Sequence, residues 1–133
     1  MSKYSGKIKS IDFKPQVLSP AFNKRTDAYG GPIENRAKAV LDILATMRRH
    51  VGDDFPILIK LNSEDIIDGG LTVSDALQAG LMLQDAGIDA IELSGGTVVT
   101  GDHCRTEISS EEKEAYWRKA AKAFKDKVTT ALI

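Results

Sequence analysis

Apolar residues recur every three or four positions between residues 33 and 50, which is the spacing of one buried face of an α-helix. Pro32 suits the first turn of such a helix and Gly52 suits its end, so the pattern predicts a helix over Ile33–His50. The members of the apolar stripe are Ile33, Ala37, Val40, Leu41, Leu44 and Met47.

Two short apolar runs follow this helix, at Phe55–Leu61 and Ile88–Ser94. Nearly continuous apolar runs of this length are typical of parallel strands that are covered on both faces. Between the runs, Thr72 and Asp75 form a capping box in which Asp replaces the usual Glu. The sequence therefore predicts a helix at Val73–Ala86 between two strands.

The beginning of the chain has a different character. Pro15 and Pro20 exclude regular helix, so residues 1–17 are expected to form a loose arm with one short edge strand at Lys7–Phe13. Residues Ala21–Pro32 are rich in Asn, Asp, Gly and Pro, and these residues favour a long loop before the first helix.

The end of the chain repeats the alternation of helix and strand. Ser109 and Glu112 form a capping box for a helix at Ser110–Lys127, and Val128–Ile133 is expected to begin a third strand. Strands that alternate with helices indicate an α/β fold with a parallel sheet, and residues 18–133 form one domain of it. This pattern alone fits both a barrel and an open, doubly wound sheet.

Composition and charge argue against several classes of binding partner. The 133 residues carry a net charge of −1, and the charges are scattered, which argues against nucleic acid and an anionic membrane as partners. No apolar run approaches the ~20 residues of a membrane span, and Cys104 is the only cysteine. We expect a cytoplasmic protein that binds a small molecule.

Ligands of parallel α/β proteins lie at the carboxyl ends of the strands, so Lys60 is the first candidate site residue. Its alternation with Ile59 and Leu61 points it to the other face of the strand, where its ammonium would meet an electron-rich ring or an anion. The alternative is a lysine that extends to water. Ser94–Thr97 forms either an anion-binding nest of backbone N–H groups or a tight turn that needs small residues.

The other polar and aromatic candidates have simpler explanations. We expect a solvated loop for the His and Cys cluster Asp102–Arg105, and a solvated acidic loop for the carboxylates Glu64, Asp65 and Asp68. His50 is expected to supply a charge that complements the helix dipole. The aromatic pair Trp117 and Phe124 is expected to pack in the core.

Longer motifs carry a resemblance to a known family. The segment Leu18–Arg36, LSPAFNKRTDAYGGPIENR, resembles the signature loop of the NADH:flavin oxidoreductase and old yellow enzyme family. The likeness extends over about Leu18–Ile133 through further segments. These are Ile59–Asp65, Gly69–Thr72, Asp85–Asp89, Ile91–Thr97 and Ser110–Trp117.

The resemblance implies an FMN-binding (β/α)8 TIM barrel that takes hydride from NAD(P)H and passes it to an activated alkene or a similar acceptor. By the same resemblance, Lys60 matches the basic residue that faces the N1/O2 edge of the flavin and stabilises the charge of its reduced ring. A complete barrel takes about 250 residues, so we expect a partial barrel here.

One stretch departs from the family. The family carries a His followed by Asn or His before the signature loop, often with a Tyr close behind, and these residues bind and protonate the substrate. The corresponding stretch, Gly6–Pro15, contains none of them. Two hypotheses follow: a piece of an FMN-dependent NAD(P)H oxidoreductase with Lys60 at its flavin, or a non-catalytic partial barrel that self-associates through exposed edges.

Overall fold

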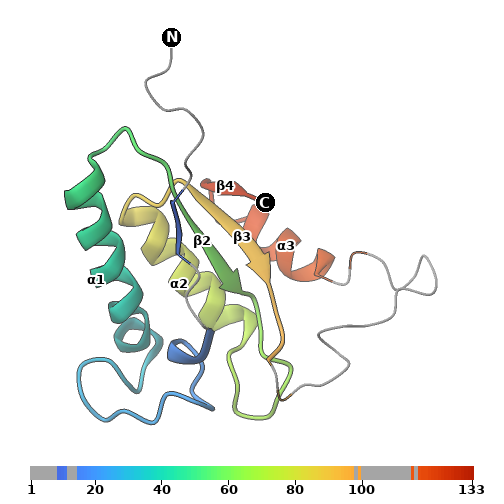
Figure 1. Ribbon diagram of the computed structural model, residues 1–133. Coiled ribbons are helices and arrows are strands. Elements are labelled where there is room, and N and C mark those ends of the chain that lie inside the picture. The colour runs from blue at the N-terminus through green and yellow to red at the C-terminus, as the bar shows by residue number, and fades with distance from the viewer. Residues whose placement is uncertain (1–8, 12–14, 98, 100–114, 116) are drawn as a thin grey trace.

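The computed structural model describes residues 9–11, 15–97, 99, 115 and 117–133. Within these residues the strands form one parallel sheet, and their order in the sheet is their order along the chain (Figure 1). The strands are β1 (Lys9–Ile11), β2 (Ile57–Asn62), β3 (Ala90–Ser94) and β4 (Ala131–Leu132). The expected edge strand and all three expected later strands are therefore present, and β2, β3 and β4 are each shorter than the range expected.

Helices connect the neighbouring strands and lie on one side of the sheet, while the other face carries no helix among the described residues (Figure 1). They are the 3-10 turn η1 (Pro15–Val17) and the helices α1 (Ile33–Val51), α2 (Val73–Asp85) and α3 (Arg118–Lys125). A doubly wound sheet carries helices on both faces, whereas a barrel carries them on its outside only. Sequential strand order with helices on one face thus defines part of a (β/α)8 barrel.

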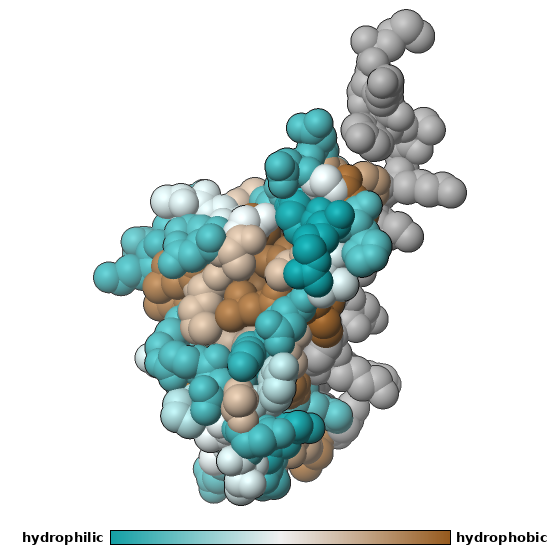
Figure 2. All heavy atoms as spheres, turned by 90° about the vertical axis from the view of Figure 1, so that its left-hand side faces the viewer, coloured by the Kyte–Doolittle hydropathy of each residue, from teal (hydrophilic) through white to brown (hydrophobic). Residues whose placement is uncertain are grey.

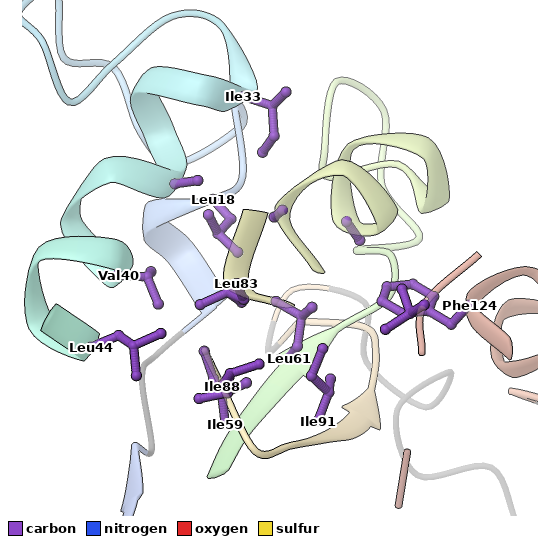
Figure 3. Packing of buried hydrophobic residues seen from close by; sticks show 14 of the residues in the cluster. Leu18, Ile33, Val40, Leu44, Ile59, Leu61, Leu83, Ile88, Ile91 and Phe124 are labelled. Carbon is purple, nitrogen blue, oxygen red and sulfur yellow. The ribbon is translucent and has the colours of Figure 1, made fainter. Parts of the chain in front are cut away.

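The core lies between the sheet and this helix layer. Alternate residues of β2 and β3 point into it, and each fully buried Ile, Leu or Phe side chain stabilises the fold by about 1.5–3 kcal/mol. Figure 3 shows the side chains of the three helices gathered over those of the strands. Labelled there are Val40 and Leu44 of α1, Leu83 of α2, Phe124 of α3, Ile59 and Leu61 of β2 and Ile91 of β3.

Two of the helices match the sequence expectation closely. The α1 helix ends one residue beyond His50, where Gly52 adopts a φ of 80°. The α2 helix begins at its capping box, because the Thr72 hydroxyl accepts a hydrogen bond from the Asp75 backbone N–H at 3.2 Å. Periodicity and capping together therefore located both helices to within two residues.

The expectation for the third helix was wrong at its start. The α3 helix begins at Arg118 rather than Ser110, because Ala115 has a φ of 49° and Trp117 lies in a turn. A left-handed residue interrupts the succession of helical hydrogen bonds. The proposed capping residues Ser109 and Glu112 lie outside the described residues.

Arg48, near the end of α1, bonds to the segments that precede β2 and β3. Its guanidinium donates to the backbone carbonyls of Phe55 at 2.6 Å and Gly87 at 3.0 Å, and it pairs with the Asp89 carboxylate at 2.7 Å. That same carboxylate oxygen accepts the Ile57 N–H at 2.7 Å. One side chain thus joins α1 to the segments that lead into β2 and β3.

Arg36, near the beginning of α1, fastens the loop of residues 18–32 in the same way. Its guanidinium donates to the carbonyl oxygens of Leu18 and Gly31 and pairs with Asp75 of α2 at 2.7 Å. Only 5% of the Arg36 side chain is exposed. Ten of the 15 residues of this loop are turn-forming or charged, and only Leu18 belongs to the core cluster, so polar contacts of this kind largely determine its shape.

We expect Arg36→Met to destabilise the protein by about 3 kcal/mol, because it leaves the buried Leu18 carbonyl, the Gly31 carbonyl and the Asp75 carboxylate without their partner. Urea unfolding followed by circular dichroism measures this loss. Arg25→Met is the matched control, since Arg25 pairs with Asp27 on an exposed part of the same loop and should change the midpoint far less. Equal midpoints for the two variants would show that Arg36 does not hold the loop.

Candidate functional site

The carboxyl ends of β2 and β3 bring two charged side chains together on the face of the sheet that no described helix covers. Lys60 lies opposite Glu92 in the parallel register of these strands. The Lys60 Nζ and Glu92 Oε1 atoms are 2.5 Å apart, and the side chains are 49% and 46% exposed. Ile59 and Leu61 point into the core instead, so the alternation predicted for Lys60 is confirmed.

Beyond this ion pair, hydrogen bonds tie the loop after β2 to the loop after β3. The Ser63 backbone N–H and hydroxyl both donate to the Ser94 carbonyl, at 2.8 and 2.9 Å. The buried Asn62 side chain donates to the Gly96 carbonyl at 2.7 Å. These contacts hold the two loops together at the carboxyl ends of β2 and β3.

The segment Ser94–Thr97 is held by contacts with the loop after β2. The Gly96 N–H donates to the Glu64 carbonyl at 2.7 Å, so it is not free for an anion. Gly96 has a φ of 72°, a conformation that favours glycine. The structure thus supports the explanation by small residues rather than an anion nest at Gly96.

Gly95 is required for a different reason. A β-carbon at this position would lie 2.1 Å from the Trp117 ring, so the indole packs directly on the glycine backbone. Through this contact, the residue that precedes α3 lies against the residue that follows β3. Phe124 is fully buried, as expected, while Trp117 is only half-buried and lines the cleft between α3 and β4.

The expected solvated acidic loop after Lys60 is wrong for one of its carboxylates. Asp65 is fully buried, and its Oδ2 atom accepts the Leu71 N–H at 2.8 Å while its own N–H donates to the Leu71 carbonyl at 3.0 Å. Gly70 packs against it, since a β-carbon there would lie 2.8 Å from the Asp65 Cβ. Asp65 therefore closes the loop that Gly69 and Gly70 make possible, whereas Asp68 is exposed as expected.

The loop of residues 18–32 lies at the same end of the sheet (Figure 1) and carries an exposed charged cluster. The Tyr29 hydroxyl donates to Asp42 at 3.0 Å, which raises the pKa of the phenol above its usual value of 10.0. The hydrogen bond from Arg25 lowers the pKa of Asp27. The lysine ammonium of Lys38 lies 5.1 Å from the Tyr29 ring centroid. The contacts of this cluster lie within the loop and between the loop and α1.

Two other sequence candidates are accounted for differently. His50 is exposed in the last turn of α1, and its Nδ1 atom lies 2.8 Å from the Thr46 carbonyl, which is the position expected for a side chain that complements the helix dipole. Asp102–Arg105 lie outside the described residues. Over the part of the chain that the structure describes, no helix has the length and apolarity needed to cross a membrane.

Glu92 is the site residue that sequence reasoning missed. Within β3, Ala90–Ser94, Glu92 is the single carboxylate, and this was the available signal, because an acid in a covered strand requires a partner. The partner follows only from the register of β3 against β2.

Parallel strands in sequential order with helices on one face define a segment of a (β/α)8 barrel, and Lys60 lies near the carboxyl end of one of its strands. Sequence comparison specifies its kind: the chain matches the NADH:flavin oxidoreductase / NADH oxidase family over residues 14–133. The chain belongs to this family, whose members use a flavin, FMN, with NADH or NADPH as reductant. Because the match begins at residue 14, the domain boundary after residue 17 stays a prediction.

Characterised relatives cover only part of this chain, and this chain covers only a small part of them. It is similar to an NADH oxidase of Thermoanaerobacter brockii, with 35% identity over 81 residues, which are 61% of this chain and 12% of the relative. An NADPH dehydrogenase of Halalkalibacterium halodurans is 36% identical over 84 residues, which are 63% of this chain and 24% of the relative.

Solved structures agree with the fold. A 2-naphthoyl-CoA reductase superimposes with a TM-score of 0.76 and 32% identity, over 88% of this chain and 18% of that one. Morphinone reductase superimposes with a TM-score of 0.60 and 21% identity, over 88% of this chain and 28% of that one. Both neighbours are TIM-barrel reductases, so the expected partial (β/α)8 barrel is confirmed.

We expect Gly95→Ala to displace the Trp117 ring, because its methyl group would occupy the position of the indole. Trp117 is the only tryptophan of the chain, so its fluorescence emission reports its packing on Gly95 directly. The emission maximum should shift to longer wavelength as the ring becomes more exposed. Ser94→Ala, which adds no atom beside the ring, is the control. An unshifted spectrum for Gly95→Ala would contradict the packing described here.

Proposed function

We propose that this chain provides the flavin-facing strands of an FMN-dependent NAD(P)H oxidoreductase, with Lys60 as the cation beside the flavin ring. The observation that carries the proposal is the position of Lys60. Its ammonium lies on the uncovered face of the sheet, near the carboxyl end of β2, where parallel α/β proteins bind their ligands.

The charge of Lys60 suits this role. Reduced flavin gathers negative charge at its N1/O2 edge, and a cation fixed beside that edge stabilises the reduced ring more than the oxidised one. Bound FMN would supply the centre that accepts hydride from NAD(P)H and passes it on. Lys60 fits the edge of the flavin ring. The FMN phosphate is not assigned to Gly96, because the Gly96 N–H already donates a hydrogen bond to the Glu64 carbonyl.

The proposal concerns the flavin rather than the final acceptor. The chain spans 12% to 24% of the length of the curated relatives described above, and Gly6–Pro15 lacks the His, Asn and Tyr that the resemblance assigns to substrate activation. A small-molecule acceptor in the cytoplasm is consistent with the composition. Its chemical class is left open.

We expect the purified chain to bind FMN weakly and to prefer the reduced form, because one sheet face offers a wall to the ring and a charge to its edge. Titration to about 1 mM FMN, equivalent to a binding free energy of about −4 kcal/mol, covers this range. Trp117 fluorescence and the quenching of flavin emission report binding of oxidised FMN. Trp117 fluorescence alone, under dithionite, reports the reduced form.

Lys60→Gln should weaken binding of reduced FMN by about tenfold and that of oxidised FMN by less, because the lost charge acts on the anionic ring. Lys122→Gln, which neutralises an exposed lysine on α3, is the control. The proposal is overturned for this chain if wild-type protein takes up no FMN over the whole titration. Equal losses for both forms of FMN would remove Lys60 from the role of flavin cation.

A second function, self-association of a non-catalytic partial barrel, is favoured by the edges of the structure. Within the described residues, β1 and β4 each have a strand neighbour on one side only. On the side where α1 lies, Figure 2 shows apolar surface framed by polar residues, and Ile43 and Met47 of that helix are only partly buried. Unpaired strand edges beside apolar surface invite another copy.

The opposite edge carries a cleft between α3 and β4 with a volume of about 700 Å³. Its apolar lining includes Leu93, Ala121 and Leu132, and the cations Arg118, Lys122 and Lys125 flank it. Two such four-stranded sheets contain the eight strands of a complete barrel. We infer that a second copy would join β4 to the β1 edge of its neighbour.

Sedimentation velocity over a concentration series tests this second function. Wild-type protein should form a reversible dimer, and Ile133→Lys should return it to the monomer because Ile133 lines the cleft and is 69% exposed. Val99→Lys is the matched control, since Val99 is 65% exposed but is not part of the cleft lining. A monomer at every concentration would exclude self-association.

A further inference from the structure

Lys60, the residue proposed as the flavin cation, already forms an ion pair with Glu92. Their Nζ and Oε1 atoms are 2.5 Å apart, and the strand register sets the two residues directly opposite each other. A carboxylate at this distance compensates most of the ammonium charge that a third group would experience. We propose that Glu92 is a positioning residue that competes with the flavin for Lys60 and thereby limits how strongly the reduced ring is stabilised.

This inference rests on the proposed function of Lys60 and adds a regulator of its strength. About half of each side chain is exposed on the uncovered face, so the pair is open to a ligand rather than sealed in the core. Asn62 and Ser63 are engaged with the loop after β3, so they cannot take the place of Glu92. In the ligand-free protein the ammonium is held at the surface of the sheet by Glu92.

The competition has a direct consequence for affinity. Reduced FMN carries more negative charge at the ring edge than oxidised FMN and therefore draws Lys60 away from Glu92 more strongly. Removing the Glu92 charge leaves the whole ammonium field to the ring. The ratio of the Kd of oxidised FMN to the Kd of reduced FMN must then rise.

Glu92→Gln preserves the shape of the side chain and removes its charge. We expect this ratio of Kd values to rise by about tenfold, which corresponds to a midpoint potential about 30 mV higher for a two-electron couple. Both Kd values come from the Trp117 fluorescence titrations, and a dye-coupled reductive titration gives the potential independently. Asp126→Asn is the control, because it neutralises the acid of an exposed ion pair on α3, Lys122–Asp126.

The same substitution in a Lys60→Gln background separates an effect through Lys60 from a direct effect of the carboxylate. If Glu92 acts through Lys60, the rise should shrink to less than about twofold in this background. Glu92→Ala repeats the test should the Gln variant fail to fold.

Three results would overturn the inference. A rise of the same size in both backgrounds, or no rise in a wild-type protein that does bind FMN, would remove Glu92 from this role and leave the proposed function intact. Absence of FMN binding by wild-type protein would overturn both.

Discussion

The side chain of Arg36 connects three parts of the structure, which are the loop of residues 18–32, α1 and α2. The loop of residues 18–32 is mostly polar, so its position over α1 depends on donors that reach its backbone carbonyls. The bond to Asp75 extends the connection to α2, which crosses between β2 and β3. A guanidinium suits this position because its planar fork serves several acceptors at once. Through this one residue, the loop at the mouth of the sheet is fixed to the helices behind it.

Most of the fold could be predicted from the sequence, because apolar period and capping are local signals. The helix at Ile33–His50 and the capping box at Thr72 were both located in this way. The start of α3 was not, since the left-handed φ of Ala115 has no local signature. The burial of Asp65 was missed for a related reason: its partner is the backbone of Leu71, and the closure of that loop depends on close packing against Gly70.

The candidate site was predicted in part. Alternation along β2 and the family resemblance both directed attention to Lys60, and the structure places it on the open face. Its partner Glu92 is one strand away, and pairing between strands follows from register, which a single apolar run does not specify. The contact of Trp117 with Gly95 depends in the same way on the path of a loop between β3 and α3. Sequence patterns thus identified the strand that carries the cation but not the groups that surround it.

The bonds made by Arg48 lie within two consecutive βα units, between the end of α1 and the segments that enter β2 and β3. They lie at the amino ends of the strands, whereas Lys60 lies near the carboxyl end of β2. These bonds therefore connect α1 to both strands without the loops at the end of the sheet where Lys60 lies. A block with this property can be exchanged between related barrels while its loops diverge, so recombination of whole βα units would be tolerated better here than a junction placed between α1 and β2.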